Sequence, residues 1–99
     1  MLQYLEYADL NYVRKIRFEP REDSLRIFYN DREVSNLLMD EPEIVTELLL
    51  KSAEIQGDDS IRINFDNKNF IRRLSHRPGE YGDIVELGGL EPDRLKLDE

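Results

Sequence analysis

The sequence predicts a small α+β domain in which an antiparallel sheet packs against one main amphipathic helix. Apolar and charged residues alternate over residues 12–19 and 25–30, which is the spacing of half-buried strands. Residues 41–56 instead place their apolar side chains at helical spacing. A chain of 99 residues suits one hydrophobic core, so we expect residues 1–99 to fold as a single domain.

The N-terminal third of the chain predicts an antiparallel meander. Residues 2–8 are aromatic and apolar on both faces of an extended chain, and they favour a strand over a helix. A turn at residues 9–11 leads to the strand over 12–19. Turn-forming residues at 20–24 then lead to the strand over 25–30. These connections are too short for parallel crossovers, so neighbouring strands must run antiparallel.

The apolar faces of the strands over 12–19 and 25–30 predict how the two strands pair. The faces meet when Phe18 lies opposite Leu25 and Ile16 lies opposite Ile27. A shift of one residue would turn one of these faces to solvent. We therefore expect this register in the folded sheet.

The outer face of this hairpin carries a basic and aromatic patch. The predicted register places Arg17 directly opposite Arg26 and Lys15 opposite Phe28. Like charges opposite each other destabilise a sheet, so we expect Glu19, acids from the tail or a partner, or a bound anion to compensate them. Cations around an aromatic ring are similar in chemistry to platforms that bind single-stranded nucleic acid. The alternative is that Phe28 is covered by another element.

The segment from Asp40 to Glu43 carries the strongest local signal, and it predicts the start of the main helix. Asp40 is a favourable N-cap, Glu43 lies three residues later as in a capping box, and Pro42 suits the first turn. Gly57 marks the end of the helix. The apolar residues that should pack across the sheet are Ile44, Val45, Leu48, Leu49 and Ile55.

The rest of the chain predicts shorter elements. Residues 60–65 predict a strand, and residues 83–87 predict a last strand that the following pair of glycines ends. Residues 68–76 fit either a short helix or the second arm of a hairpin, and we favour the helix. Residues 90–99 form an acidic tail with at most one weakly docked turn.

Charged groups supply most of the solubility of this chain. Charged residues make up 36% of it, with 22 acids against 14 bases and a formal net charge of −8. This ionic content, with little Gln, Cys or Met, is typical of thermostable proteins, so we expect a protein of a thermophile or of a virus. An ordinary acidic intracellular protein is the alternative.

The composition also excludes several classes of protein. No apolar run approaches the ~18–20 residues that span a bilayer, which excludes membrane insertion. The first residues lack the pattern of a secretory signal, so we expect an intracellular protein. The absence of cysteine excludes disulfides and thiolate metal sites.

The charges are unevenly distributed along the chain. Residues 31–60 hold nine acids and two bases, whereas residues 61–77 hold five bases and one acid. The second segment predicts an anion-binding or nucleic-acid-binding surface. The alternative is that its bases pair with the acids of the same protein. The candidate residues of this segment are Arg72, Arg73, His76 and Arg77.

Residues of catalytic or metal-binding types do not occur at the sequence spacings that known catalytic and metal sites use. Ser75, His76 and Asp83 are the residue types of a hydrolytic triad, but they lie within nine residues of one another. The chain has one histidine, which excludes a histidine-rich metal site. A carboxylate-only magnesium site is the remaining metal hypothesis, at Asp58, Asp59 and Asp66. We expect no catalysis, no metal and no cofactor.

The expected function is a non-catalytic protein-interaction or regulatory module that binds another protein or self-associates. Tyr4, Tyr7 and Tyr12 are the candidate interface residues, because tyrosine is favoured in interface cores. These tyrosines could instead line the core of the monomer. The alternative function is nucleic-acid binding through the basic residues named above. A third hypothesis is an acidic mimic of nucleic acid, built from the helix over 41–56 and the tail over 90–99.

Overall fold

The computed structural model describes residues 2–11, 13–56, 60–65 and 68–91, which form an α+β fold, as predicted. Two helices and six strands follow one another along these residues. The helices are α1 (Leu2–Leu10) and α2 (Glu43–Gln56). The strands are β1 (Ile16–Pro20), β2 (Ser24–Tyr29), β3 (Arg32–Leu38), β4 (Ser60–Phe65), β5 (Lys68–Arg77) and β6 (Ile84–Glu91).

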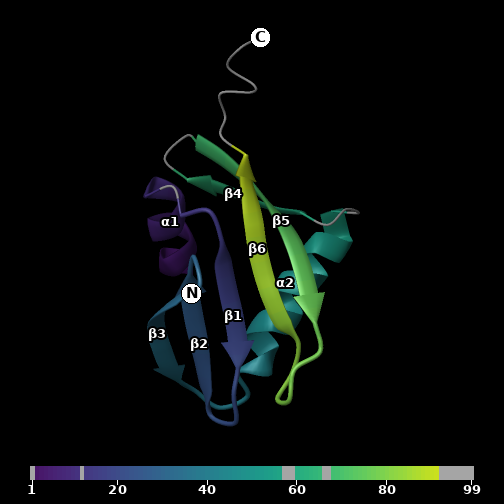
Figure 1. Cartoon of the computed structure of the whole chain (residues 1–99). Helices are drawn as coiled ribbons and strands as arrows, with labels where there is room; N and C mark the ends of the chain where they lie inside the picture. Colours follow the sequence, from purple (N-terminus) through teal and green to yellow (C-terminus); the bar gives the residue numbers. More distant parts are fainter. Residues whose placement is uncertain (1, 12, 57–59, 66–67, 92–99) are drawn as a thin grey trace.

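All of these strands join one antiparallel sheet in the order β3-β2-β1-β6-β5-β4. The first three strands form one meander and the last three form another. The pair β1–β6 joins the two meanders at the centre of the sheet (Figure 1). Helix α2 connects the two edge strands, β3 and β4, and crosses one face of the sheet (Figure 1).

One hydrophobic core lies between the helices and the sheet. Helix α1 contributes Leu5 and Ala8 to it, and α2 contributes Ala53. Both helices therefore cover the same face of the sheet. We call the opposite face, which Figure 1 shows toward the viewer, the open face. Strands β1, β2 and β6 supply the fully buried apolar residues Ile16, Phe18, Leu25, Ile27, Val85 and Leu87.

The register of β1 and β2 differs by two residues from the predicted one. Phe18 pairs with Ile27 rather than with Leu25, and Pro20 is the partner of Leu25. Both registers bring the apolar faces together, because side chains alternate with a period of two. In the observed register a tight turn follows Pro20, in which the Arg21 amide donates to the Ser24 carbonyl at 2.8 Å.

Strand β3 was not predicted. It follows a two-residue turn in which Asn30 and Asp31 both have positive φ, of 50° and 69°, as a type I′ hairpin turn requires. Asn and Asp tolerate this conformation, so the pair was an available signal for a hairpin. Phe28 pairs with Glu33 and Ile27 with Ser35, which leaves Val34 as the extra residue of a β-bulge.

The strand predicted over residues 2–8 is wrong, because this segment is helix α1. Leu5 and Ala8 are three residues apart, so one helical face brings both into the core. Tyr7 and Leu10 are exposed. A short run that is apolar on all sides does not distinguish a strand from a helix, and packing against the sheet decides between them.

The short helix predicted over residues 68–76 is also wrong, and the hairpin alternative is correct. Strand β5 pairs with β4 over residues 68–73 and with β6, on its other side, over residues 71–77. Strand β6 does not end at the glycine pair but continues through it to Glu91. The register shifts there, so that Gly89 and Leu90 together face Arg72 across the ladder.

Helix α2 confirms the predicted main helix, although it begins at Glu43. The φ of Glu41 is 52°, so the chain cannot be helical there, and the predicted cap at Asp40 lies too early. The Thr46 hydroxyl donates to the Glu43 carbonyl at 3.0 Å in the first turn. Gly57, and the part of the acidic tail after Glu91, lie outside the described residues. Neither described helix has the length and apolar character needed to cross a bilayer.

The turn between β5 and β6 packs against the start of α2 through Gly82. The φ of Gly82 is 133°, and a Cβ atom there would lie 2.7 Å from the Cβ of Glu43. Gly88, in β6, is the opposite case, because nothing lies within 4 Å of a Cβ built on it. A side chain would therefore clash at Gly82, whereas there is room for one at Gly88.

We expect Gly82→Ala to lower the free energy of unfolding by about 1–3 kcal/mol, because alanine is strained at this φ and meets Glu43. The control Gly88→Ala should change it by less than about 0.5 kcal/mol. Urea unfolding followed by circular dichroism measures both. Equal effects of the two substitutions would contradict this account of the turn.

Candidate functional site on the open sheet face

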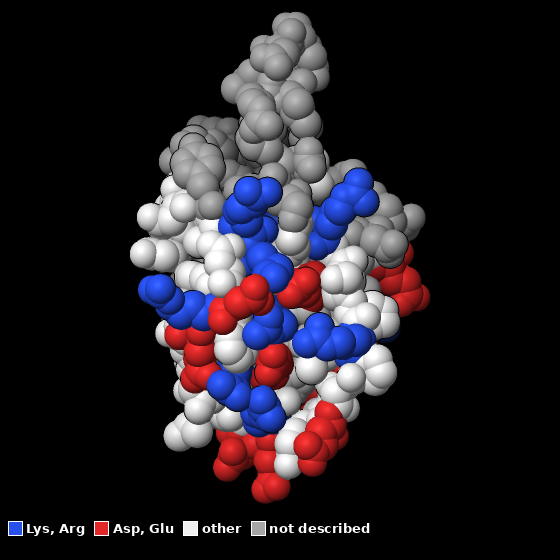
Figure 2. Space-filling view, viewed as in Figure 1, with Lys and Arg blue, Asp and Glu red and all other residues white. Residues whose placement is uncertain are grey.

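The open face is covered by charged side chains of alternating sign. Figure 2 shows Lys and Arg interleaved with Asp and Glu along the middle of this face, with acids gathered at its lower end. Because residues that pair across an antiparallel ladder share a face, the strand register identifies the members of this surface. They include Arg17 and Glu19 of β1, Arg26 and Phe28 of β2, Arg73, Ser75 and Arg77 of β5, and Glu86 and Gly88 of β6.

Phe28, on β2, lies between two arginines on this face. The guanidinium carbon of Arg17 is 4.2 Å from the centre of the Phe28 ring, and that of Arg26 is 5.1 Å from it. Cation–π contacts of this kind stabilise a ring on an otherwise exposed surface. Phe28 is buried, and the side chains of Arg17 and Arg26 lie over its ring. The ring is therefore not presented for stacking with a base.

The like-charge contact predicted between Arg17 and Arg26 does not occur. Arg17 pairs across the ladder with Phe28, and Glu19 is the direct partner of Arg26. The shift of two residues thus places an acid where the predicted register placed a base. Opposite charges across the ladder stabilise the sheet, which favours the observed register.

Acids of the same chain neutralise the basic patch. Arg17 Nε donates to a Glu19 carboxylate oxygen at 2.6 Å, and Arg17 Nη1 donates to Asp31 Oδ1 at 2.8 Å. Lys15 Nζ donates to the other Asp31 oxygen at 3.0 Å. Arg26 forms an ion pair with Glu33 on the neighbouring strand. Three of the predicted anion-binding residues are thus already paired with acids of the same chain. They are Lys15, Arg17 and Arg26.

These contacts shift the proton affinities of the groups involved. Hydrogen bonds from Lys15 and then Arg17 lower the pKa of Asp31 below its ordinary value of 3.8. Burial alone would lower the pKa of Arg17, but its hydrogen bonds to Asp31 and Glu19 outweigh burial and raise it. Each shift favours the charged form of its group, so the ion pair between Asp31 and Arg17 is maintained at neutral pH.

Arg72 is a structural residue and not part of a surface site, contrary to the prediction. Its side chain is fully buried on the helix-covered side. Its guanidinium donates to the Val13 carbonyl at 2.7 Å and to the Arg14 carbonyl at 3.3 Å. The ladder between β1 and β6 begins only at Ile16, so these carbonyls precede it and Arg72 supplies their donors.

The other residues of the predicted basic segment are separated by the alternation of β5. Arg73 and Arg77 are exposed on the open face, four residues apart. His76 lies on the opposite side of the strand from Ser75, with its Nδ1 3.7 Å from a carboxylate oxygen of Asp83. Segment 72–77 therefore does not form one contiguous basic site.

A second surface, the tyrosine groove, lies between α1 and β3. It has a volume of about 550 Å³ and is lined by Gln3, Tyr4, Tyr7, Tyr29 and Val34. The Tyr7 and Tyr29 rings stack with their centres 6.0 Å apart. The Tyr29 hydroxyl donates to the Tyr4 carbonyl at 2.6 Å. Of the three predicted interface tyrosines, Tyr4 and Tyr7 come together here.

Several predicted site residues fall outside the described part of the chain. Other residues that line the observed surfaces were not predicted from the sequence. Tyr12 and the acids of the magnesium hypothesis, Asp58, Asp59 and Asp66, lie outside the described residues. Tyr29 and Val34 were missed because the hairpin that presents them depends on the unrecognised β3. A hollow beside Gly88 on the open face was missed because its walls come from three separate segments.

We expect Arg72→Met to lower the free energy of unfolding by about 2–4 kcal/mol, because two backbone carbonyls lose buried donors. The matched control is Arg73→Met on the adjacent, exposed residue, which should cost less than about 0.5 kcal/mol. Urea unfolding of the two variants measures the difference. A loss of similar size in both would mean that Arg72 does not have this role.

Asp31 should titrate below pH 3.8 in the folded protein. Because its folded pKa lies below its unfolded one, its contribution to stability is complete above the unfolded value and is lost as pH falls through the folded value. A ¹³C NMR titration of the side-chain carboxyl carbon measures the midpoint. Lys15→Met should raise this midpoint, since it removes a hydrogen-bond donor. A wild-type midpoint at or above 3.8 contradicts the contacts described for Asp31.

Comparison with known proteins leaves the function to be argued from these surfaces. No protein-family model matches the chain, and no curated protein sequence matches it either. The open face and the tyrosine groove are the surfaces on which a functional proposal can rest.

Proposed function

We propose that this protein is a non-catalytic protein-interaction module that binds its partner through the tyrosine groove. The observation that carries the proposal is a concave, largely aromatic surface with accessible side chains. Tyr7 is 58% exposed and Val34 is 42% exposed. The groove has a volume of about 550 Å³, and sites that hold a small molecule measure ~300–1,000 Å³. Exposed tyrosines in such a setting are typical of interface hot spots.

The groove is also held in shape before any partner arrives. The Tyr4 hydroxyl and the Ser35 hydroxyl are 2.9 Å apart, and the Tyr29 hydroxyl is fixed on the Tyr4 backbone. These bonds attach α1 to the sheet edge and orient two of the groove's rings. A preorganised site loses less conformational entropy on binding, which favours affinity.

Side-chain docking fits this edge of the sheet better than the addition of a further strand. Strand β3 is an edge strand, and no described residue pairs with its outer side. However, the bulge at Val34 interrupts the regular ladder, and bulges protect edge strands from pairing with other chains. Val34 lines the groove, so the bulge contributes an apolar contact there.

The net charge indicates the chemistry of the partner. Two copies of a chain with a charge of −8 repel each other, whereas a basic segment is attracted. We therefore assign the occupant as a segment of another protein, with large apolar side chains flanked by Lys or Arg. Nucleic-acid binding has less support, because Phe28 is covered and the cations around it are paired with acids.

A peptide-display selection on the full chain tests the proposal. Selected 12-residue peptides should share an apolar or aromatic anchor beside basic residues. Tyr7→Ala should weaken the binding of the synthesised peptides by about tenfold or more, since Tyr7 is the most exposed ring of the groove. The matched control is Tyr81→Ala, another exposed tyrosine, in the turn at the far end of β5 and β6 (Figure 1).

Two outcomes would overturn the proposal. One is a set of peptides whose affinity is the same for Tyr7→Ala and wild type. The other is a dimer, seen by analytical ultracentrifugation of the wild-type chain, that Tyr7→Ala dissociates, because a second copy would then occupy the groove. Thermal unfolding of each variant verifies that it is folded.

A further inference from the structure

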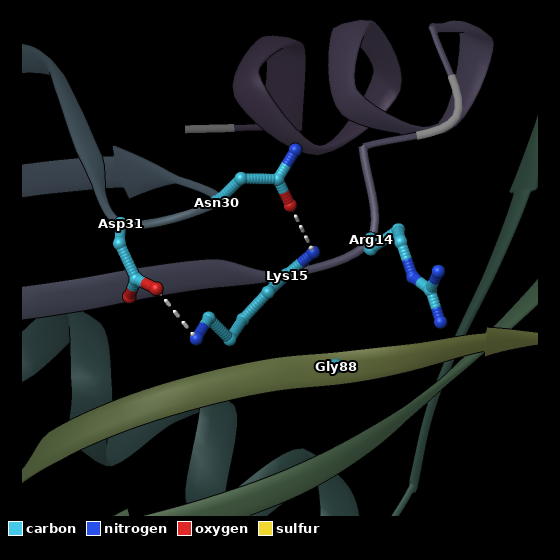
Figure 3. A pocket seen from close by; sticks show the side chains of 5 residues that line it. All are labelled: Arg14, Lys15, Asn30, Asp31 and Gly88. Atoms are coloured by element: carbon cyan, nitrogen blue, oxygen red, sulfur yellow. Dashed lines mark hydrogen bonds and ion pairs between the residues drawn. The ribbon is translucent and has the colours of Figure 1, made fainter.

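The hollow on the open face lies where β1 separates from β6. Its volume is about 340 Å³, and it is lined by Arg14, Lys15, Asn30, Asp31 and Gly88. Figure 3 shows Gly88 on β6 at its base, with the Arg14 side chain on one side and Lys15 turned toward Asp31 on the other. The hollow exists because Gly88 has no side chain and nothing lies within 4 Å of a Cβ built on it.

The arginines around Gly88 differ from Arg17 and Arg26, the two arginines that cover Phe28 on the open face. Arg14 lines the hollow, and Arg73 is the register partner of Gly88 on β5. Both arginines are exposed, and neither side chain forms an ion pair or hydrogen bond with any residue that the structure describes. In contrast, Arg17 and Arg26 are bonded to acids. Uncompensated positive charge therefore gathers beside an open space.

We propose that this hollow, the Gly88 hollow, binds the phosphate group of a small phosphate monoester. Guanidinium groups present parallel donors that match the oxygens of a phosphate, whereas Lys15 on the opposite side is paired with Asp31. A phosphate monoester carries a charge of about −1.5 to −2 at pH 7, which two unpaired arginines can balance. The site shares no lining residue with the tyrosine groove.

The acids around the Gly88 hollow favour a single phosphate over a polyanion. Asp31 lines the hollow, and Glu86 lies 3.9 Å from both Lys15 Nζ and Arg17 Nη1. A nucleic-acid strand extended along the open face would pass these carboxylates and would be repelled by them. A small ligand would contact only the hollow itself, beside Arg14 and Arg73.

An NMR titration of the ¹⁵N-labelled full chain tests this site. Adenosine monophosphate and glucose 6-phosphate should each shift the amide signals of Arg14, Lys15, Gly88 and Arg73 with saturation, whereas adenosine should not. Inorganic phosphate should shift the same signals. Arg14→Gln and Arg73→Gln should each weaken binding by about tenfold, the effect of losing a charged hydrogen bond. Arg77→Gln, on the same face and strand as Arg73, should leave it unchanged.

A filling variant separates a shaped site from general attraction of anions. Gly88→Leu should place a side chain in the hollow and abolish binding while the rest of the spectrum stays in place. If that variant does not fold, the double variant of Arg14 and Arg73 to Gln gives the answer. Binding that survives the double variant, or that Arg77→Gln weakens equally, overturns the proposal. So does binding of a single-stranded oligonucleotide in the absence of any response to the two monoesters.

Discussion

Both helices of this protein pack against one face of the sheet, and the chemistry of the other face follows from that constraint. An uncovered sheet face must shield its central strands while it remains in water. Arg17 and Arg26 meet both needs, because their guanidinium groups cover Phe28 and also bond to acids. Arg17 bonds to Glu19 on its own strand, and Arg26 bonds to Glu33 on the neighbouring strand. The charged fraction of 36% is therefore partly a requirement of the open face and not only a source of solubility.

The strand register determines which charges on this face are satisfied. It places Glu19 opposite Arg26, so that a predicted repulsion becomes an attraction. The alternation of side chains along β5 separates Arg72 from Arg73, which are adjacent in sequence but lie on opposite faces of the strand. The first is buried on backbone carbonyls, whereas the second stands beside Gly88 with no described partner. The same strand pairing thus places an acid opposite Arg26 and a glycine opposite Arg73.

The features that the sequence predicts correctly are those with local signals. Helix α2 has a helical apolar period over fourteen residues, and β2 has clear alternation, so neither needs information from elsewhere in the chain. The register was missed because a shift of two residues preserves alternation, and only the turn and the cross-strand charges distinguish the alternatives. The role of Arg72 was unpredictable for a related reason, since its acceptors are 58 and 59 residues away in the sequence. The hollow over Gly88 depends on strand neighbours in the same way.

The register of β1 and β2 is the central claim, because the open face and the hollow both depend on it. Backbone NOEs between these strands in an NMR spectrum of the labelled protein test it most directly. The structure predicts cross-strand contacts that join Phe18 to Ile27 and Pro20 to Leu25. Contacts that join Phe18 directly to Leu25 would place Arg17 opposite Arg26 and would contradict this account of the open face.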